Sequence, residues 1–363
     1  AVEVAERLVD ELLEPFPVHE FNLEVEASVG IALAPLHGVT HEVLMQRAEV
    51  AMYQAKTRHT RVEVYDPHLD HHSPRRLGLL SELRGAIAAG HVILHHQPKV
   101  DLRTGAVIGT EALVRWIHPT RGLVSPNEFV PMTEHTGLIR PLTVHVLHEA
   151  AEQAMCWARR GLTMSVSVNI SARSLHDGGL LHDVATCLDV TGLPPRLLSL
   201  EITESALMAD LSRAKETLQA LAAMGVQLAI DDFGTGYSSL AYLHELPVGE
   251  VKIDRSFVTN VARNEQGRII VRSTIDLVRR LGLRSVVEGV EDAATEQWFR
   301  EAGCDAAQGF HIGRPMAPAA LDDWLAARAV ERFAARSAAV ADEREDDTVP
   351  RMRLVGLDGE AAS

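Results

Sequence analysis

Eight short apolar or β-branched runs recur between residues 77 and 330, and all but the first two are separated by longer segments of helical period. The runs are Val92–Gln97, Ala106–Val114, Met164–Ile170, Leu197–Thr203, Val226–Asp232, Val251–Asp254, Arg284–Glu288 and Asp305–Gly309. Strands that alternate with helices predict repeated β/α units on a parallel sheet. Eight such units in about 250 residues have the usual size of a closed barrel. The predicted fold class is therefore α/β, a (β/α)8 TIM-like barrel.

The connection between the first two runs is too short for a parallel crossover. Only the five residues Asp101–Gly105 join them, whereas a crossover between parallel strands needs a dozen or more. The two runs therefore predict a hairpin, so that the barrel contains one antiparallel strand. In such a hairpin Gln97 lies roughly level with Glu111, at the end of the barrel where the other strands finish.

Polar or ionic residues stand at the strand ends that form the active-site face of a barrel enzyme. They are Gln97, Glu111 with Arg115, Asn169, Glu201 with Glu204, Asp231 with Asp232, Lys252 with Asp254, Glu288 and Gln308. Any one of them has an ordinary explanation as a cap of a loop or helix. A closed barrel, however, brings all of these ends to one mouth, so we expect them to form one site.

The carboxylates predicted at this mouth outnumber its cations. The acids are Glu111, Glu201, Glu204, Asp231, Asp232 and Glu288, and the cations are Lys252 and Arg115. Like charges in a partly dry pocket take up protons or bind cations. Oxygen ligands without Cys or His favour Mg²⁺ or Mn²⁺ over zinc, and the adjacent Asp231 and Asp232 indicate two ions bridged by Asp231. The alternative is a buried ion-pair network with Lys252 and Arg115.

This arrangement predicts metal-dependent hydrolysis of a phosphate ester. Two metal ions that share a carboxylate lower the pKa of a bound water and hold it in line with phosphorus. Lys252 beside that water would favour its hydroxide form, and Arg115 suits a non-bridging phosphate oxygen. The spacing leaves open whether the substrate is a sugar phosphate or a nucleotide. It also leaves open whether Gly234 and Gly236 form a tight exit turn or a mobile loop that sets the second metal site.

The charge balance and the apolar pattern exclude two other classes of partner. Fifty Asp plus Glu against thirty-five Lys plus Arg give a formal net charge of −15, the wrong sign for a protein that binds nucleic-acid polymers through the backbone. No apolar run reaches the 18 or so residues of a membrane helix. Cys156, Cys187 and Cys304 lack disulfide or zinc spacing, so we expect a cytoplasmic chain. Because it begins within a helical pattern, we also expect a fragment whose upstream half would carry any membrane anchor.

Composition divides the chain into four segments. Residues 67–76 combine prolines, histidines and charges without an apolar period, which predicts a linker. Upstream, a strand at Asn22–Ala34, an amphipathic helix at His41–Lys56 and a strand at Arg61–Tyr65 predict a partial α/β domain over residues 1–66. The barrel is predicted over residues 77–330. Residues 331–363 predict a helical extension followed by a disordered acidic tail.

The strand-end motifs resemble those of the EAL-domain cyclic-di-GMP phosphodiesterases over about 230 residues. In family order they are EALVRW at Glu111–Trp116, SVNIS around Asn169, LEITES around Glu201 and Glu204, DDFGTGYSSL from Asp231, VKID around Lys252, EGVE from Glu288 and QGFHIGRP from Gln308. The resemblance implies cleavage of cyclic-di-GMP to linear 5'-pGpG, which lowers this second messenger in bacterial signalling. It also implies a homodimer formed through the barrel. The alternative is a catalytically silent cyclic-di-GMP receptor that acts through a partner, although such receptors usually lose metal carboxylates and none is lost here.

The resemblance also implies a role for each motif residue. Glu111, Asn169, Glu201 and Asp231 would hold one metal ion, and Asp231 and Asp232 would hold the other. Lys252 and Glu288 would act on the metal-bound water, and Glu204 would support the loop after the fifth strand. The residues implied to contact substrate are Gln97, Arg115, Gln308 and Asp254. The family commonly has Tyr before the Gln-Pro of the first strand, and His96 stands there in this chain, so we expect a change in substrate packing.

Residues 1–66 resemble the C-terminal half of a GGDEF diguanylate cyclase domain. The motifs are SVGIALAP at Ser28–Pro35, AMYQAK at Ala51–Lys56 and VYD at Val64–Asp66. The GGDEF signature itself does not occur in the sequence. Where the family usually has Gly-Arg-Asn after the Ala-Lys pair, this chain has His59-Thr60-Arg61, so cyclase activity is not expected.

Overall fold

The structure is a computed structural model. It describes residues 1–12, 16–18, 21–23, 27–57, 60–67, 74–134, 136–234, 243–263 and 265–330. The predictions for most of the linker (68–73), for the loop after the acidic pair (235–242) and for the C-terminal segment (331–363) lie outside these residues.

The N-terminal region is a small α/β unit. It contains α1 (Val2–Leu12), β1 (Phe16–Val18), β2 (Phe21–Leu23), β3 (Val29–Ile31), α2 (His41–Thr57) and β4 (Val62–Val64). β3 and β4 pair in parallel. α2 lies directly on β3, since a Cβ at Gly30 would be only 2.1 Å from the carbonyl oxygen of Ala48. The predicted helix and the second strand are confirmed, but the first strand was predicted too long, because β2 pairs with β1 in a separate hairpin.

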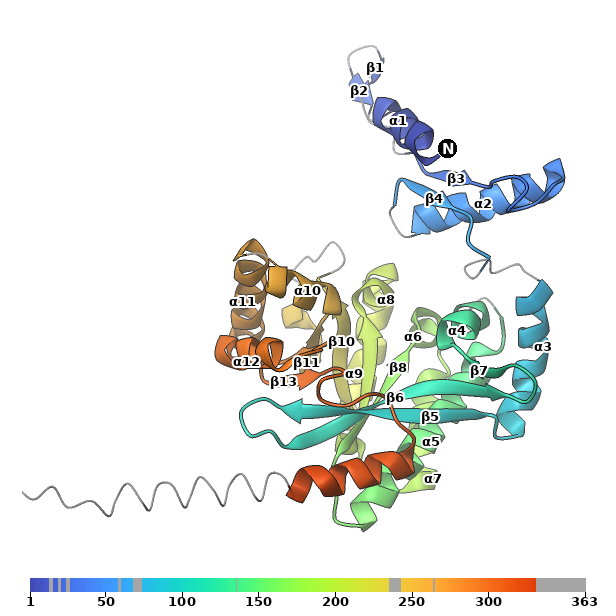
Figure 1. Cartoon of the computed structure of the whole chain (residues 1–363). Helices are drawn as coiled ribbons and strands as arrows, with labels where there is room; N and C mark the ends of the chain where they lie inside the picture. Colours follow the sequence, from blue (N-terminus) through green and yellow to red (C-terminus); the bar gives the residue numbers. More distant parts are fainter. Residues whose placement is uncertain are drawn as a thin grey trace, which may run out of the picture.

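Eight strands close into a barrel in the second region (Figure 1). They are β5 (Val92–Asp101), β6 (Val107–His118), β8 (Ser165–Ile170), β9 (Leu198–Thr203), β10 (Gln227–Phe233), β11 (Glu250–Ile253), β12 (Arg284–Val287) and β13 (Ala306–Gln308). The order around the barrel is β5, β13, β12, β11, β10, β9, β8, β6, and β6 pairs back with β5. Seven strands are parallel to one another, and β5 is antiparallel to both of its neighbours. The predicted (β/α)8 TIM-like barrel with one antiparallel strand is confirmed.

The hairpin of β5 and β6 has the predicted register and is longer than predicted. Gln97 pairs with Glu111. Its turn is closed by the Asp101 carboxylate, which accepts a hydrogen bond from the Thr104 N–H at 2.7 Å. At the other end β6 pairs with β7 (Gly122–Val124). The sequence analysis missed β7, a three-residue strand that lies outside the eight repeated β/α units from which the barrel was predicted.

Helices cover the outer face of the barrel (Figure 1). They are α3 (Pro74–Ala88), α4 (Pro126–Glu134), α5 (Ile139–Arg159), α6 (Ala172–His176), α7 (Leu180–Thr191), α8 (Glu204–Ala209), α9 (Leu211–Ala223), α10 (Arg255–Arg263), α11 (Glu265–Arg280), α12 (Ala293–Ala302) and a final helix over 318–330, with short 3-10 turns η1 (Pro195–Leu197) and η2 (Leu243–Glu245). α3 begins inside the segment predicted as a linker, because proline suits the first turn of a helix. Ser171, Thr203 and Asp292 each cap a helix by accepting the backbone N–H three residues later. Within the described ranges, no helix combines the length and apolar character needed to cross a bilayer.

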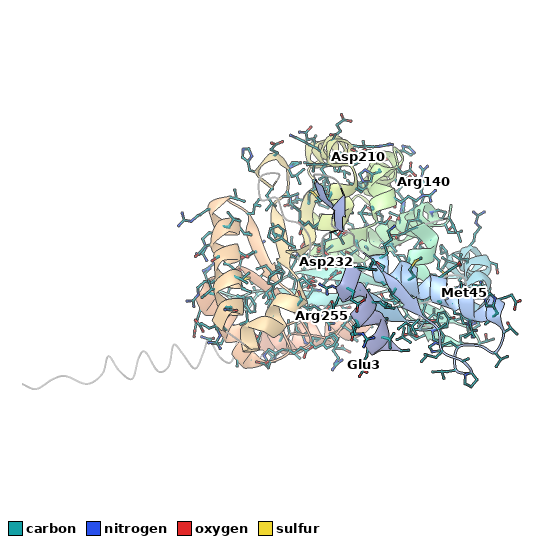
Figure 2. The ribbon with its side chains drawn as sticks, turned by 90° about the horizontal axis from the view of Figure 1, so that it is seen from above. Glu3, Met45, Arg140, Asp210, Asp232 and Arg255 are labelled. Carbon is teal, nitrogen blue, oxygen red and sulfur yellow. The ribbon has the colours of Figure 1, made fainter. Side chains whose placement is uncertain are left out.

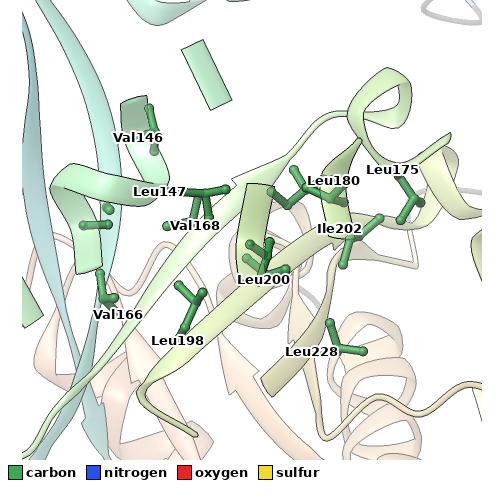
Figure 3. Packing of buried hydrophobic residues seen from close by; sticks show 14 of the residues in the cluster. Val146, Leu147, Val166, Val168, Leu175, Leu180, Leu198, Leu200, Ile202 and Leu228 are labelled. Carbon is green, nitrogen blue, oxygen red and sulfur yellow. The ribbon is translucent and has the colours of Figure 1, made fainter. Parts of the chain in front are cut away.

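The hydrophobic core lies between the strands and the helices, as Figure 3 shows. Buried residues from β8, β9 and β10 pack against residues of α5, α6 and α7. The strand residues are Val166, Val168, Leu198, Leu200, Ile202 and Leu228, and the helix residues are Val146, Leu147, Leu175 and Leu180. Each such side chain contributes about 1.5–3 kcal/mol on burial. Because successive strand residues face opposite ways, the residues between them, such as Ser167, Asn169 and Glu201, face the barrel interior.

His96 lies on the outer face of β5, away from the barrel mouth. Its ring packs edge-on against Trp157 with the centroids 4.9 Å apart, and its Nδ1 is 3.3 Å from the Thr110 hydroxyl. Its Nε2 is buried and has no hydrogen-bond partner among the described residues. This position contradicts the expectation that His96 changes substrate packing, since the neighbouring Gln97 faces the interior instead.

We expect His96 to make a contribution to the unfolding free energy that is lost as the pH decreases from about 6.5 to about 4, and that shows as a difference between the unchanged protein and a variant without it. Burial lowers the pKa of His96 from 6.5 to about 4, with a smaller contribution from His95. In this window the unfolded chain binds a proton at His96 and the folded chain does not, so roughly 3 kcal/mol of unfolding free energy is lost. Urea unfolding between pH 7 and pH 4 measures this loss. The His96→Phe variant should lose less by that amount, and an equal loss in both proteins would show that His96 is not its source.

Candidate active site

Lys252 stands at the centre of a group of carboxylates at the carboxyl ends of the strands. The side chain is fully buried. Its Nζ lies 2.5 Å from Glu201 Oε2, 2.7 Å from Glu288 Oε1, 3.2 Å from Asp231 Oδ2 and 3.5 Å from Glu111 Oε2. These acids belong to β9, β10 and β6 and to the residue that follows β12. Barrel closure therefore brings four separate parts of the chain to one ammonium group.

Amide side chains fix the orientation of Glu111. Asn169 Nδ2 donates to Glu111 Oε1 at 2.7 Å, and Gln308 Nε2 donates to Glu111 Oε2 at 2.6 Å. Gln97 Oε1 lies 3.1 Å from Gln308 Nε2, and Gln97 Nε2 donates to the carbonyl of Gly313 at 3.0 Å. Because Asn169 uses its nitrogen on Glu111, its amide oxygen is the atom that a cation would take.

Burial and charge set the protonation of these groups. Burial alone would lower the pKa of Lys252, but the four acids, led by Glu111, outweigh it and raise that pKa well above its ordinary value. Burial raises the pKa of Glu201 to about 7 and that of Glu288 to about 8. Burial would also raise the pKa of Glu111, yet Lys252 and the two amides lower it. Lys252 is therefore an ammonium whose single charge does not balance the acids around it.

The acids fit hard divalent cations. Oxygens of Glu111, Glu201 and Asp231 lie within 4.8 Å of one another, and so do oxygens of Asp231, Asp232 and Glu288. Glu201 Oε1 is buried and has no hydrogen-bond partner among the described residues. A buried carboxylate oxygen without a partner is unfavourable, and a cation would supply that partner. The alternative, an ion-pair network, is present around Lys252. The carboxylates of this network are also oxygen donors of the kind that a divalent cation binds, so they can form a metal site next to the ammonium.

The backbone turns sharply at the acidic pair. Asp232 has a φ of 53°, in the left-handed region that residues other than glycine rarely adopt. Asp231 Oδ1 accepts the N–H of Asp232 at 2.9 Å, which holds the turn. Consecutive strand residues would otherwise face opposite sides, so this conformation lets both carboxylates serve one site. Burial, with the charge of Asp231, raises the pKa of Asp232 to about 6.

Glu204 holds the chain where it leaves β10. The side chain is buried, and its Oε2 accepts the N–H of Gly234 at 3.0 Å. Gly234 has a φ of 95°, and a Cβ there would lie 2.7 Å from the ring of Phe257, so this close approach requires glycine. Glu204 was predicted to support the following loop, and its contact with Gly234 makes it a positioning residue for the acidic pair.

Replacing Glu204 by alanine is expected to lower the unfolding free energy by about 1–2 kcal/mol, because the half-buried N–H of Gly234 loses its acceptor. If the acids hold a catalytic cation, turnover should fall roughly 10–100-fold, the usual effect of removing a residue that orients metal ligands. The Glu204→Gln variant keeps an acceptor oxygen and should retain most of the activity. Steady-state kinetics and urea unfolding of the two variants test this, and equal losses would mean that the charge matters rather than the hydrogen bond.

Arg115 and Asp254 make their hydrogen bonds outside the carboxylate group. Arg115 Nη1 donates to the carbonyl of Val114 at 2.8 Å, and its side chain lines a cavity of about 540 Å³. Asp254 Oδ1 accepts the N–H of Ser256 at 2.9 Å at the start of α10. Both residues therefore lie at the margin of the site.

A cleft of about 450 Å³ opens over the carboxylates, which is the size of a small-molecule site. Gln97, Glu111, Asp231, Glu288 and Gln308 line it, together with Arg255 and Phe310. The last two were not predicted, although Arg255 directly follows the VKID motif and Phe310 lies two residues after Gln308. The guanidinium of Arg314 lies 4.4 Å from the centre of the Phe310 ring. Seen from above in Figure 2, Asp232 and Arg255 lie near the middle of the molecule.

Comparison with known proteins identifies the barrel. Residues 80–315 match the family model described as EAL domain. The chain belongs to the EAL domain family. In addition to this EAL domain, residues 1–61 match the model described as diguanylate cyclase, GGDEF domain.

Two curated relatives are similar to most of this chain. The bifunctional diguanylate cyclase/cyclic di-GMP phosphodiesterase MucR of Pseudomonas aeruginosa is 41% identical over 318 residues, which are 87% of this chain and 46% of that protein. The cyclic di-GMP phosphodiesterase PA2567 of the same organism is 36% identical over 329 residues, which are 89% of this chain and 56% of that protein. The chain thus spans about half the length of these relatives.

Solved structures of EAL domains resemble the barrel. The PaMucR phosphodiesterase in complex with c-di-GMP matches with a TM-score of 0.65 and 43% identity. The match covers 67% of this chain and 99% of the PaMucR chain. The EAL domain of Mycobacterium smegmatis DcpA matches with a TM-score of 0.55 and 36% identity. The match covers 65% of this chain and 96% of the DcpA chain.

The predicted site residues of the EAL domain fall into two groups in the structure. The first group is linked by direct contacts around Lys252 and comprises Glu111, Asn169, Glu201, Asp231, Lys252, Glu288, Gln97 and Gln308. The second group borders it and comprises Asp232, Glu204, Arg115 and Asp254. The EAL domain therefore places the three amides and four of the acids together around Lys252, and the Arg115 guanidinium in the adjoining cavity.

Proposed function

We propose that the chain is a metal-dependent phosphodiesterase that hydrolyses cyclic-di-GMP to linear 5'-pGpG and so lowers this second messenger in bacterial signalling. The observation that carries the proposal is the group of four acids around Lys252, beneath a cleft of about 450 Å³. An unpaired buried oxygen on Glu201 marks a place for a cation. The relatives, which are named as cyclic di-GMP phosphodiesterases, indicate the substrate.

The cofactor in this proposal is a pair of Mg²⁺ or Mn²⁺ ions. Glu111, Asn169, Glu201 and Asp231 would hold one ion, and Asp231 and Asp232 would hold the other. When bound, such ions act as Lewis acids and lower the pKa of water. Lys252, which contacts Glu201, Asp231 and Glu288, would act with Glu288 on the attacking water and favour its hydroxide form. Glu288 lines the same cleft and lies 2.7 Å from the Lys252 ammonium, and it is the carboxylate that would take up the proton of the attacking water.

The substrate would extend over two adjoining cavities. Gln97 and Gln308 line the cleft above the acids, and Arg115 lines the cavity of about 540 Å³ beside it. Leu113 lines both cavities, so they are neighbours. A cyclic dinucleotide has two bases and two phosphates, and a guanidinium suits a phosphate oxygen. We therefore assign Gln97, Gln308 and Arg115 to substrate contact. Asp254, which lies at the margin of the site, is assigned with them only on the family resemblance.

Incubation of the purified chain with cyclic-di-GMP tests the proposal. With Mg²⁺ or Mn²⁺ present, chromatography should show linear 5'-pGpG, and EDTA should prevent its formation. If the chain binds cyclic-di-GMP but leaves it intact with metal present, the receptor alternative is correct. If the chain neither binds nor cleaves the dinucleotide, both functions are excluded.

We also propose that the chain forms a homodimer through the barrel. Ile269 and Ile270 are adjacent apolar side chains on α11 that are 59% and 53% exposed, and their burial in an interface would be favourable. A second copy of the chain would cover them. Light scattering of the purified chain measures the assembly, and a monomer at all accessible concentrations would exclude the dimer.

The proposed compartment is the cytoplasm. Cys156, Cys187 and Cys304 are all free thiols, which is usual in a reducing environment. A bacterial second messenger would be degraded in the same compartment.

A further inference from the structure

A second buried lysine lies in the barrel interior below the carboxylates. Lys99 on β5 is 3% exposed, and its Nζ lies 2.5 Å from Glu250 Oε1 on β11. Glu250 precedes Lys252 by two residues on the same strand, so both side chains face the interior. Lys99 follows Gln97 by two residues on β5, which runs in the opposite direction. The pair therefore spans the interior one layer nearer the amino ends of the parallel strands.

Lys99 is close enough to Glu111 and Glu201 to lower the pKa of both carboxyls. Burial raises the pKa of Glu201 to about 7, although Lys252 and Lys99 both act to lower it. Lys99 likewise contributes to the lowered pKa of Glu111. The residue that pairs with Lys99 on β6 is Gly109, which places no side chain beside it. The interior thus holds two ammonium groups, and only Lys252 contacts the acids that could hold metal.

We propose that Glu250 is a positioning residue that holds Lys99 on the floor of the barrel and keeps it from competing with the divalent cations for the acids. The inference rests on the proposed metal-dependent function. A buried charge without a partner is strongly unfavourable, and lysine has a long, flexible side chain. Without Glu250, the ammonium of Lys99 would turn to the carboxylates with which it already interacts electrostatically, those of Glu111 and Glu201. Of these, Glu201 Oε1 has no hydrogen-bond partner among the described residues.

The Glu250→Gln variant tests the inference, because it removes the charge and keeps the shape. We expect its affinity for Mn²⁺, measured by isothermal titration calorimetry on the whole chain, to be at least about tenfold weaker than that of the unchanged protein. Adding Lys99→Met removes the competing ammonium, and the double variant should regain the original affinity to within about threefold. A purely structural role for the pair would leave the double variant as weak as the single one or weaker.

Controls separate this inference from the proposed function. The Glu245→Gln variant breaks the exposed ion pair of Lys215 and Glu245, whose atoms are 2.7 Å apart, and should bind Mn²⁺ as the unchanged protein does. If the unchanged protein binds no Mn²⁺, the proposed function and the inference both fall. If it binds Mn²⁺ and Glu250→Gln binds equally well, or if the double variant stays weak, only the inference is overturned.

A milder variant covers the case in which Glu250→Gln does not fold. Glu250→Asp keeps the charge and shortens its reach toward Lys99. Weaker Mn²⁺ binding by this variant that Lys99→Met restores would support the inference, and unchanged binding would overturn it.

Discussion

Replacing Glu111 by glutamine is expected to lower metal-dependent hydrolysis of cyclic-di-GMP at least about a thousandfold while the chain keeps its fold. Glu111 shares the proposed cation with Glu201 and Asp231, and loss of a cation removes several kcal/mol of transition-state stabilisation. The fold should persist, because Lys252 keeps contacts with three other acids. Because Lys252 and two amides favour the ionised form of Glu111, loss of this charge should lower the melting temperature without unfolding the chain.

Two measurements check the Glu111 prediction. Steady-state kinetics should show the loss of turnover, and thermal unfolding should show that Mn²⁺ stabilises the variant less than the unchanged protein. The exposed Glu245→Gln change is the matched control for loss of one carboxylate. Lost turnover with an unchanged response to Mn²⁺ would mean that Glu111 acts on the substrate rather than on the cation.

Replacing Lys252 by methionine should be among the most destabilising changes in the barrel and should also stop catalysis. The fully buried ammonium has four carboxylates within 3.5 Å, and removing one partner of a buried ion pair costs about 3–5 kcal/mol. We expect kcat to fall at least about a hundredfold, as for other groups that act on a proton, with KM changed less than about threefold. Equal losses in kcat and in affinity for substrate would show that Lys252 binds substrate instead.

Divalent cations should reverse the instability of the Lys252→Met variant. The acids that lose their ammonium are the proposed metal donors, so bound cations would replace the missing positive charge. Thermal unfolding with increasing Mn²⁺ should therefore raise the melting temperature of the variant more than that of the unchanged protein. A smaller rise in the variant would mean that Lys252 helps to build the metal site.

The strands and the composition of the site were predictable because each depends on local sequence. Every barrel strand lies on a predicted run, and the five residues between the first two runs sufficed to predict the hairpin and the pairing of Gln97 with Glu111. The polar residues follow from the same pattern, since they alternate with the apolar residues that pack under the helices. Strand β7 was missed because it lies outside the repeated β/α units.

Contacts across the barrel interior could not be predicted from the sequence. Lys99 meets Glu250 across the barrel from a strand that is not its neighbour, and such a contact depends on the stagger of the strands around the whole barrel. The left-handed backbone at Asp232 was also missed, because aspartate has no strong preference for that conformation. The position of Arg255 in the cleft was also missed, because it depends on the direction in which α10 begins at the mouth of the barrel.

The alternation of apolar and polar residues along the strands has a consequence for protein engineering. Side chains such as Val166 and Leu200 join the strands to the helices, while Ser167 and Glu201 occupy the interior. Mutational libraries confined to interior positions other than Lys252, Lys99 and Glu250 would leave the apolar layer between strands and helices untouched, so new chemistry could be selected in this barrel without redesign of its outer layer.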